Sequence, residues 1–255
     1  MPLPRAIFPD LEDAGVLITG GASGIGAALV EGFAAQKARV AFIDIDRSAG
    51  DALVGTLAGA RHTPLFIPAD LSSVAEIRRA VATVAEAFGT IRVLVNNAAW
   101  DDRRDIDDLT EDYWQKSQDI NIRPLVFLIQ SVLPHMREAG GGAIINFSSI
   151  AYLLNMGAFP AYATAKAGII GLTKSMAGRL GRENIRVNAV MPGMVLTERQ
   201  KKLWVSDADA TAFLDRQALK FNLTAEDMVD PCLYLASDCS RAVTAQTMIV
   251  DGGVM

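Results

Sequence analysis

The sequence is poor in the residues that build metal centres and disulfide frameworks. Its 255 residues include only two histidines, His62 and His135, and two cysteines, Cys232 and Cys239. The cysteine spacing matches neither a CxxC motif nor a disulfide framework. We therefore expect free thiols and no metal site.

Long apolar runs and an excess of positive charge are also missing. No run reaches the roughly 18 residues needed to span a bilayer, and residues 1–5 lack the apolar stretch of a secretory signal. The 24 Lys and Arg residues against 29 Asp and Glu residues give a formal net charge of −5, which argues against nucleic acid or an anionic membrane as a partner. These absences favour a cytoplasmic globular protein.

The sequence does contain material for one large core, with 51% hydrophobic and 21% charged residues. Short apolar runs alternate with longer amphipathic stretches, and no linker or repeat interrupts the alternation. The runs are apolar on both faces, as is typical of parallel strands buried between helices. The sequence predicts a single α/β domain over 1–255, a doubly wound parallel seven-stranded sheet of Rossmann type with helices on both faces. The expected strands are 16–18, 39–43, 64–67, 93–95, 143–147, 185–190 and 247–250, and the expected helical segments are 25–36, 48–57, 74–88, 111–139, 161–180 and 225–236.

Residues 194–223 depart from this regularity. Charged and aromatic residues replace the strand and helix pattern there, and a stretch that long without a strand favours a substrate lid over a surface insertion. A loop that follows a parallel strand lies beyond its carboxyl end, where such sheets bind ligands.

A glycine-rich stretch, Thr19–Gly26, follows the first expected strand and opens the first expected helix. Glycine allows the tight turn and lets backbone N–H groups approach a pyrophosphate at the helix N-terminus. A lone glycine cluster often marks only a turn, but the strand-to-helix context supports a dinucleotide site. The spacing is TGxxxGxG and differs from the standard GxGxxG.

The choice of cofactor depends on Asp44, which closes the second expected strand. A carboxylate at this position accepts hydrogen bonds from the adenosine ribose hydroxyls and repels a 2′-phosphate. Ser23 supplies no positive charge to offset that repulsion, and Arg47 falls in the following helix. The alternative is that Asp44 merely begins a turn with Asp46. We expect NAD as the cofactor.

Tyr162 and Lys166 stand four residues apart and share one face of a helix. An ammonium group beside a phenol favours the phenolate and would lower a pKa that is about 10 when unperturbed. Tyr162 would then act as a general base. A pair with this spacing usually lies on a solvated helix face and has no function. Here Ser149 lies at the carboxyl end of the preceding strand, where the sheet binds ligands, and this favours a catalytic role. Its neighbour Ser148 is a structural hydroxyl by position.

Five motifs in this order resemble the short-chain dehydrogenase/reductase family over essentially the whole chain, which ends in Val250-Asp251-Gly252-Gly253. The motifs are TGGASGIG at 19–26, Asn96-Asn97-Ala98-Ala99, Ser149, Tyr162-Ala-Thr-Ala-Lys166, and Pro192-Gly193 followed by Thr197.

The resemblance implies roles for the matched residues near the reacting centre. Ser149 would orient the substrate hydroxyl or carbonyl, and Tyr162 would transfer its proton. Lys166 would lower the pKa of the tyrosine and hydrogen-bond the nicotinamide ribose. Asn121 would hold the water of a proton relay by bending its helix locally.

The resemblance also implies how the cofactor is held. Asp70 and Leu71 would form the turn that contacts adenine, Asn97 would brace the central strand and the cofactor, and Val195 and Thr197 would grip the carboxamide. The expected cofactor set is Gly20, Ser23, Gly24, Ile25, Gly26, Asp44, Asp70, Leu71, Asn97, Tyr162, Lys166, Pro192, Gly193, Val195 and Thr197. Two positions depart from the family pattern, because Ala99 and Ala245 replace glycines that are common there.

Shorter stretches resemble the sugar dehydrogenases of this family, above all bacterial NAD-dependent aldose 1-dehydrogenases acting on D-xylose and related sugars. They are residues 6–11, 97–103, 113–114, 145–150 and 197–204. A polyol needs several polar partners and an aromatic surface, which Asn155, Arg199, Gln200 and Trp204 would supply around Ser149 and Tyr162. For each of these four, the alternative is a solvent-facing or packing side chain.

Three further expectations concern function and assembly. The main one is oxidation of an aldose at C1 to the lactone. The alternative is oxidation of a secondary hydroxyl of a polyol or of a keto-deoxy sugar acid, and Arg199 would suit the carboxylate of the acid. A catalytically idle dinucleotide sensor is a non-enzyme alternative, against which the intact Ser149, Tyr162 and Lys166 set argues. The apolar segments 111–139 and 161–180, and the resemblance, imply a homotetramer.

Overall fold

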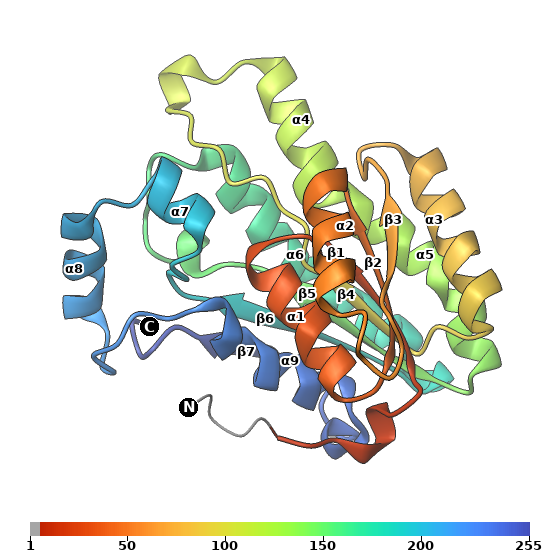
Figure 1. Ribbon diagram of the computed structural model, residues 1–255. Helices are drawn as coiled ribbons and strands as arrows, with labels where there is room; N and C mark the ends of the chain where they lie inside the picture. Colours follow the sequence, from red (N-terminus) through yellow and green to blue (C-terminus); the bar gives the residue numbers. More distant parts are fainter. Residues whose placement is uncertain (1–5) are drawn as a thin grey trace.

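The computed structural model describes residues 6–255, except for the side chains of residues 201, 203 and 207; the N-terminal stretch 1–5 lies outside the described residues. A single parallel sheet of seven strands runs through it in the order β3-β2-β1-β4-β5-β6-β7 (Figure 1). The strands are β1 Gly15–Thr19, β2 Arg39–Asp44, β3 Leu65–Pro68, β4 Val93–Asn96, β5 Gly142–Phe147, β6 Ile185–Pro192 and β7 Thr247–Val250. The predicted fold class is confirmed.

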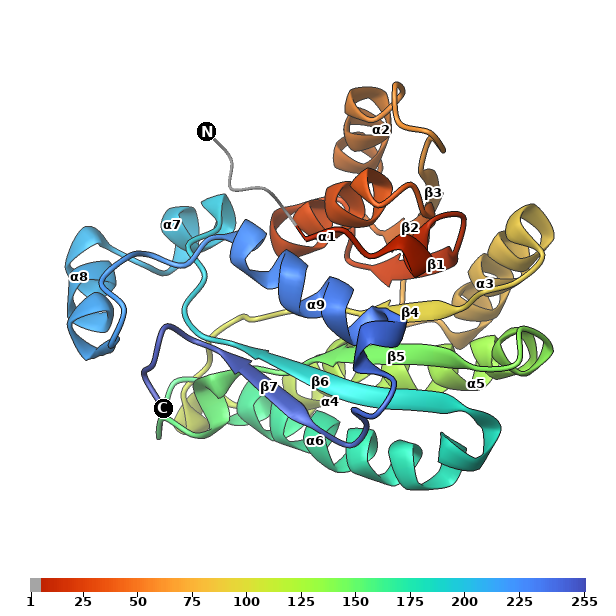
Figure 2. The ribbon, with the colours of Figure 1, turned by 90° about the horizontal axis from the view of Figure 1, so that it is seen from below.

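Helices cover both faces of the sheet (Figure 2). The core on one face joins α1 and α9 to the strands, with Phe33 and Leu233 fully buried there. The core on the other face joins α3, α5 and α6, with Ile77 and Leu128 fully buried. The helices are α1 Gly24–Ala35, α2 Arg47–Thr56, α3 Val74–Phe88, α4 Glu111–Asn121, α5 Arg123–Glu138, α6 Pro160–Leu180, α7 Glu198–Leu203, α8 Asp207–Arg216 and α9 Val229–Ala236. No helix in the described residues is long and apolar enough to cross a membrane.

The segment 111–139, predicted as one helical stretch, is two helices. α4 ends at Asn121, and Ile122 leaves the helical region with φ −132° and ψ −42° before α5 begins at Arg123. Pro124 follows at once; its missing N–H and the steric restriction it places on Arg123 favour a break at this point. Much of the apolar surface of α5 packs inside this chain, although Val126 remains 44% exposed.

Residues 194–223 also differ from expectation, because they contain the two short helices α7 and α8. Side-chain caps explain why these charged stretches fold: Thr197 accepts a hydrogen bond from Gln200 N, and Ser206 forms a capping box with Asp209. A parallel bridge between Val195 and Leu223 ties the two ends of the segment together. The helices lie beyond the carboxyl end of β6 (Figure 2).

Ala245, which replaces a glycine common in the family, sits in the turn before β7 with φ +61°. This left-handed conformation brings Cβ too close to the backbone and costs about 1–2 kcal/mol in residues other than glycine. We expect Ala245→Gly to relieve this strain and to raise the free energy of unfolding by up to about 1 kcal/mol. The gain is smaller than the full strain because glycine loses more backbone entropy on folding. Thermal unfolding should shift upward by about 2–4 °C. Ala245→Ser, which keeps Cβ, should show no such gain.

Candidate active site

The site lies where the strand order reverses, between β1 and β4, at the carboxyl ends of the strands. In doubly wound sheets the loops that leave this point diverge to opposite faces and open a crevice for a ligand. The loop after β1 carries the glycines, and the loop after β5 carries Ser149.

The glycine loop has the backbone geometry that its sequence predicts. Gly20 and Gly24 adopt φ +65° and +53°, and a Cβ at Gly20 would lie 2.8 Å from Ala98 Cα. A Cβ at Gly26 would overlap the carbonyl oxygen of Gly20. Ser23 stands at the N-cap of α1 without a side-chain cap hydrogen bond, and Ile25 follows in the first turn of the helix. The N-terminal amides of α1 are therefore available to an anion such as a pyrophosphate.

Asn97 braces this loop from the neighbouring strand. Its Nδ2 donates to the carbonyl oxygens of Thr19 at 3.0 Å and Gly20 at 3.2 Å. The Thr19 hydroxyl in turn accepts the backbone N–H of Asn97 at 3.0 Å and of Ala98 at 3.1 Å. These bonds hold the end of β1 against the end of β4.

Asp44 lies at the end of β2 with its carboxylate against the glycine loop. Oδ2 accepts the backbone N–H of Ala22 at 2.9 Å, and Oδ1 accepts that of Asp46 at 3.0 Å. The turn with Asp46 and the contact with the loop thus coexist. Each oxygen keeps a further lone pair for a ribose hydroxyl, and the charge still repels a phosphate. Arg47 is exposed at the start of α2.

Two further loops border the crevice. Asp70 Oδ1 accepts the N–H of Ser72 at 2.8 Å, which forms a turn, and Leu71 packs against the core. On the other side, a Cβ at Gly193, which follows Pro192, would lie 2.7 Å from Asp251 Cα, so the chain passes closely there. The Thr197 methyl group lies 3.3 Å from where a Cβ of Gly24 would stand. Residues after β6 therefore reach the glycine loop.

Ser149, Tyr162 and Lys166 meet at the carboxyl end of β5. Ser149 accepts the N–H of Ala151 at 3.1 Å and shares a hydrogen bond with the Tyr162 hydroxyl. Lys166 is only 2% exposed, and its Nζ donates to the carbonyl oxygen of Phe147 at 2.9 Å. Lys166 Nζ lies 5.5 Å from the centroid of the Tyr162 ring.

Ser148 holds the same helix in place, because its hydroxyl donates to the backbone carbonyl of Lys166 at 2.7 Å. It is buried and does not reach the crevice. The structural role expected for this serine is therefore the one seen.

The electrostatics of the tyrosine differ from expectation. We expected Lys166 to lower the pKa of Tyr162, but burial and the carboxylate of Asp101 raise the pKa of Tyr162 above its usual value, against the Ser149 hydrogen bond that lowers it. The reason is that the Lys166 ammonium group turns to the Phe147 carbonyl. Burial also lowers the pKa of Lys166 to about 8, partly offset by Asp101. At neutral pH the lysine is charged and the tyrosine is neutral.

Asn121 ends α4 at the break before α5, and its side chain is fully engaged. Oδ1 accepts the backbone N–H of Trp100 at 2.8 Å, while Nδ2 donates to the carbonyl oxygens of Trp100 and Ser117, both at 3.0 Å. The amide therefore fixes the start of the loop between β4 and α4. The water relay expected of this residue would have to use its backbone.

The four predicted substrate residues have different surroundings in the structure. Asn155 lies on an exposed turn with φ +53°. Arg199 Nε donates to Asp101 Oδ1 at 3.3 Å, and the Gln200 amide donates to Asp101 Oδ2. Trp204 packs against Arg103, whose Cζ lies 5.0 Å from the centroid of its ring.

Asp101 and Arg103 connect the loop after β4 to α7 and the residue that follows it, and neither is among the predicted site residues. Arg103 Cζ also lies 4.9 Å from the Phe159 ring, which is 6.1 Å from the ring of Tyr162. Within the described part of the chain, Arg103 Nε and Trp204 Nε1 are buried without an acceptor. The signal was the run of charges after Trp100, but which of them face the site depends on tertiary contacts.

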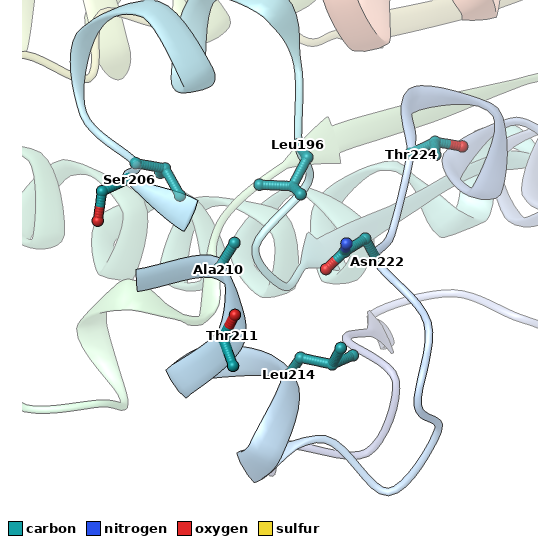
Figure 3. Close-up of a pocket in the computed structure, with 8 residues that line it drawn as sticks. Leu196, Ser206, Ala210, Thr211, Leu214, Asn222 and Thr224 are labelled. Carbon is teal, nitrogen blue, oxygen red and sulfur yellow. The ribbon is translucent and has the colours of Figure 1, made fainter. Parts of the chain in front are cut away.

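A cavity of about 410 Å³ lies elsewhere, between α8 and the chain that leads to α9 (Figure 3). Leu196, Leu214 and Asn222 are among its lining residues. None of the three catalytic candidates borders it, so we assign it no part in the chemistry.

Comparison with known proteins decides the family. The family model described as enoyl-(acyl carrier protein) reductase matches residues 20–255. The chain belongs to the short-chain dehydrogenase/reductase family. It is 56% identical, over the full length of both chains, to a Rhizobium meliloti protein named as a probable galactose dehydrogenase. It is 41% identical to the D-xylose 1-dehydrogenase of Caulobacter vibrioides, over 98% of this chain and 99% of that one.

Solved structures of this short-chain dehydrogenase/reductase family share the fold. A short-chain type dehydrogenase/reductase from Mycobacterium ulcerans superimposes with a TM-score of 0.91 at 26% identity, covering 98% of this chain and 91% of that one. The protein is thus an oxidoreductase that acts on hydroxyl groups with a nicotinamide cofactor. The glycine loop and the open N-terminus of α1 fit the pyrophosphate of such a cofactor.

Proposed function

We propose that the enzyme oxidises an aldose at its anomeric carbon to the lactone, with NAD as the cofactor. The observation that carries the proposal is the 56% identity, over both full lengths, to a relative named for galactose. A second support is the cluster formed by Ser149, Tyr162 and Lys166. A sugar hydroxyl bound there would lie next to a base and close to the proposed cofactor site.

Each residue has a step in this reaction. Ser149 holds the anomeric hydroxyl, and Tyr162 removes its proton as the C1–H bond breaks. NAD, when bound, would supply the acceptor for the hydride that leaves C1. Lys166 adds positive charge beside the tyrosine and binds the nicotinamide ribose. Asn121 carries the proton from Tyr162 toward solvent through a water at its backbone.

We further propose that residues 194–223 form the lid of this site. Thr197 and Val195 at its start hold the carboxamide, and the indole of Trp204 offers an N–H donor to a sugar oxygen. Closure over the sugar excludes water and strengthens the few polar contacts that select it.

One experiment tests the reaction. Wild-type enzyme is incubated with NAD and a panel of aldoses, sugar acids and polyols, and reduced nicotinamide is followed by its absorbance. We expect turnover of a pentose or hexose, with the lactone as the product seen by NMR. Activity confined to the secondary hydroxyl of a sugar acid would overturn the assignment to C1.

The cofactor preference has its own test. Asp44→Ala should weaken NAD binding and relax discrimination against NADP by about tenfold or more, because the repelling carboxylate is removed. The measurement is kcat/KM for both cofactors, with Asp46→Ala as the control that leaves the Asp44 charge in place. A wild-type enzyme that prefers NADP would refute our interpretation of Asp44.

We also propose that the enzyme is a homotetramer. The support is the exposed Val126 on α5, in the segment predicted to pack against a second copy. Light scattering at micromolar concentration should give four times the 27.2 kDa mass of one chain.

A further inference from the structure

Asp101, in the loop from β4 to α4, is a carboxylate beside the catalytic residues that the proposed reaction does not use. Its side chain is 19% exposed, and its two oxygens accept hydrogen bonds from Arg199 and Gln200 of α7. The preceding residue, Trp100, is held through both its N–H and its carbonyl oxygen by Asn121. Asp101 is therefore fixed between the core of the enzyme and the lid.

The charge of Asp101 reaches the reaction centre. After burial, it is the second cause of the raised pKa of Tyr162, and it opposes the effect of burial on the pKa of Lys166. Both effects have the sign expected of a negative charge close to the titrating group. A carboxylate brought in by the substrate would meet the same field.

The arginines that reach this loop are engaged in different ways. Arg199 pairs with Asp101 at 3.3 Å. Arg103 packs over the rings of Phe159 and Trp204, with its Cζ 4.9 Å and 5.0 Å from their centroids. The arginine that contacts Asp101 is therefore already paired with a carboxylate.

We propose that Asp101 is a specificity-determining residue that makes the site select neutral sugars over sugar acids. The inference rests on the proposed oxidation of a sugar hydroxyl, and it narrows the substrate class. A carboxylate accepts hydrogen bonds from sugar hydroxyls but repels a second carboxylate. Asp101 also occupies Arg199, the cation that a sugar acid would need.

The test uses two sugars that share the reacting carbon. D-galactose and D-galacturonate carry the same anomeric hydroxyl and differ only at C6, where the second has a carboxylate. The measured quantity is the ratio of their kcat/KM values. We expect wild type to favour D-galactose at least about tenfold and Asp101→Asn to narrow that ratio about tenfold, because one like-charge repulsion is removed.

Two further variants separate charge at this position from charge in general. Asp102→Asn removes the same charge from the next residue, which contacts Tyr113 through its backbone carbonyl, and should leave the ratio within about twofold. Arg199→Gln leaves Asp101 unpaired and should widen the ratio, in the opposite direction to Asp101→Asn. This second variant keeps the inference testable if Asp101→Asn fails to fold.

The outcomes distinguish the two proposals. If wild type oxidises neither sugar nor any other aldose at C1, the proposed function fails. If it oxidises D-galactose and D-galacturonate equally well, or if Asp101→Asn and Asp102→Asn change the ratio alike, the role of Asp101 is refuted while the reaction stands. A ratio that narrows in Arg199→Gln would also refute it.

Discussion

Replacing Tyr162 with phenylalanine should lower turnover by about 10² or more while NAD still binds. The change removes only the hydroxyl that shares a hydrogen bond with Ser149 and keeps the ring that packs near Phe159. Turnover is measured by absorbance of the reduced cofactor, and binding by quenching of protein fluorescence.

Tyr234→Phe is the matched control, because this tyrosine packs on the opposite face of the sheet in α9. It should retain turnover. Retention of a third of wild-type turnover by the Tyr162 variant would rule out the tyrosine as the base.

The pH dependence follows from the same residue. In the proposed reaction Tyr162 acts as a base only when deprotonated, and its pKa is raised by burial and by Asp101. The oxidation rate should therefore rise from neutral pH towards about pH 8, above which Lys166 begins to lose its proton. The groups that face Tyr162 are Ser149 and Lys166 within the site and Asp101 across it. A rate that falls between pH 7 and pH 8 would contradict this arrangement.

Replacing Lys166 with methionine should have two opposite effects. Turnover should fall by about 10² or more, because the positive charge beside Tyr162 and the ribose contact are lost. Stability at pH 7 should rise, because a buried ammonium group is costly: its pKa is lowered to about 8 from 10.5. That difference corresponds to about 3 kcal/mol of stability. Loss of the hydrogen bond from Lys166 to the Phe147 carbonyl reduces the expected gain by about 1 kcal/mol.

The stability gain should depend on pH with a definite sign. Lys166 has a lower pKa in the folded chain than in the unfolded chain, so its cost is fully present below pH 8. The cost disappears as the pH rises from about 8 to about 10.5, because the folded state gives up the proton first. The advantage of Lys166→Met in denaturant unfolding should therefore shrink over that range.

Lys174→Met serves as the control, since Lys174 is exposed on the same helix. It should change the stability little and without this pH dependence. A Lys166→Met protein that is less stable than wild type at pH 7 would show that the buried ammonium group is not the cost we assign to it.

Much of the scaffold could be predicted from local sequence. The strands were predicted from short runs that are apolar on both faces. The Tyr162 and Lys166 pair was predicted from the helical period of 3.6, and the glycine loop from backbone freedom. All three signals act over a few residues. The confirmed seven-stranded sheet places the glycine loop and Ser149 at one edge because parallel strands end together.

Local patterns fail where a side chain takes its partner from a distant segment. Asn121 was expected to hold the water of a proton relay, but its side chain binds the backbone of Trp100, 21 residues earlier in the chain. A second kind of failure concerns local signals. The break at Ile122 and the helices in 194–223 depend on caps and on a proline, and the overall composition of these segments hides such signals.

The sequence by itself determined the fold and the reaction class, because the motifs that predict them follow from short-range spacing along the chain. Only the tertiary structure decided the charges around the tyrosine and the partners of residues 194–223. Asp101 lies 61 residues before Tyr162 and pairs with Arg199, 98 residues later. Electrostatic forces act through space, so the residue that opposes ionisation of Tyr162 became visible only when the chain was folded.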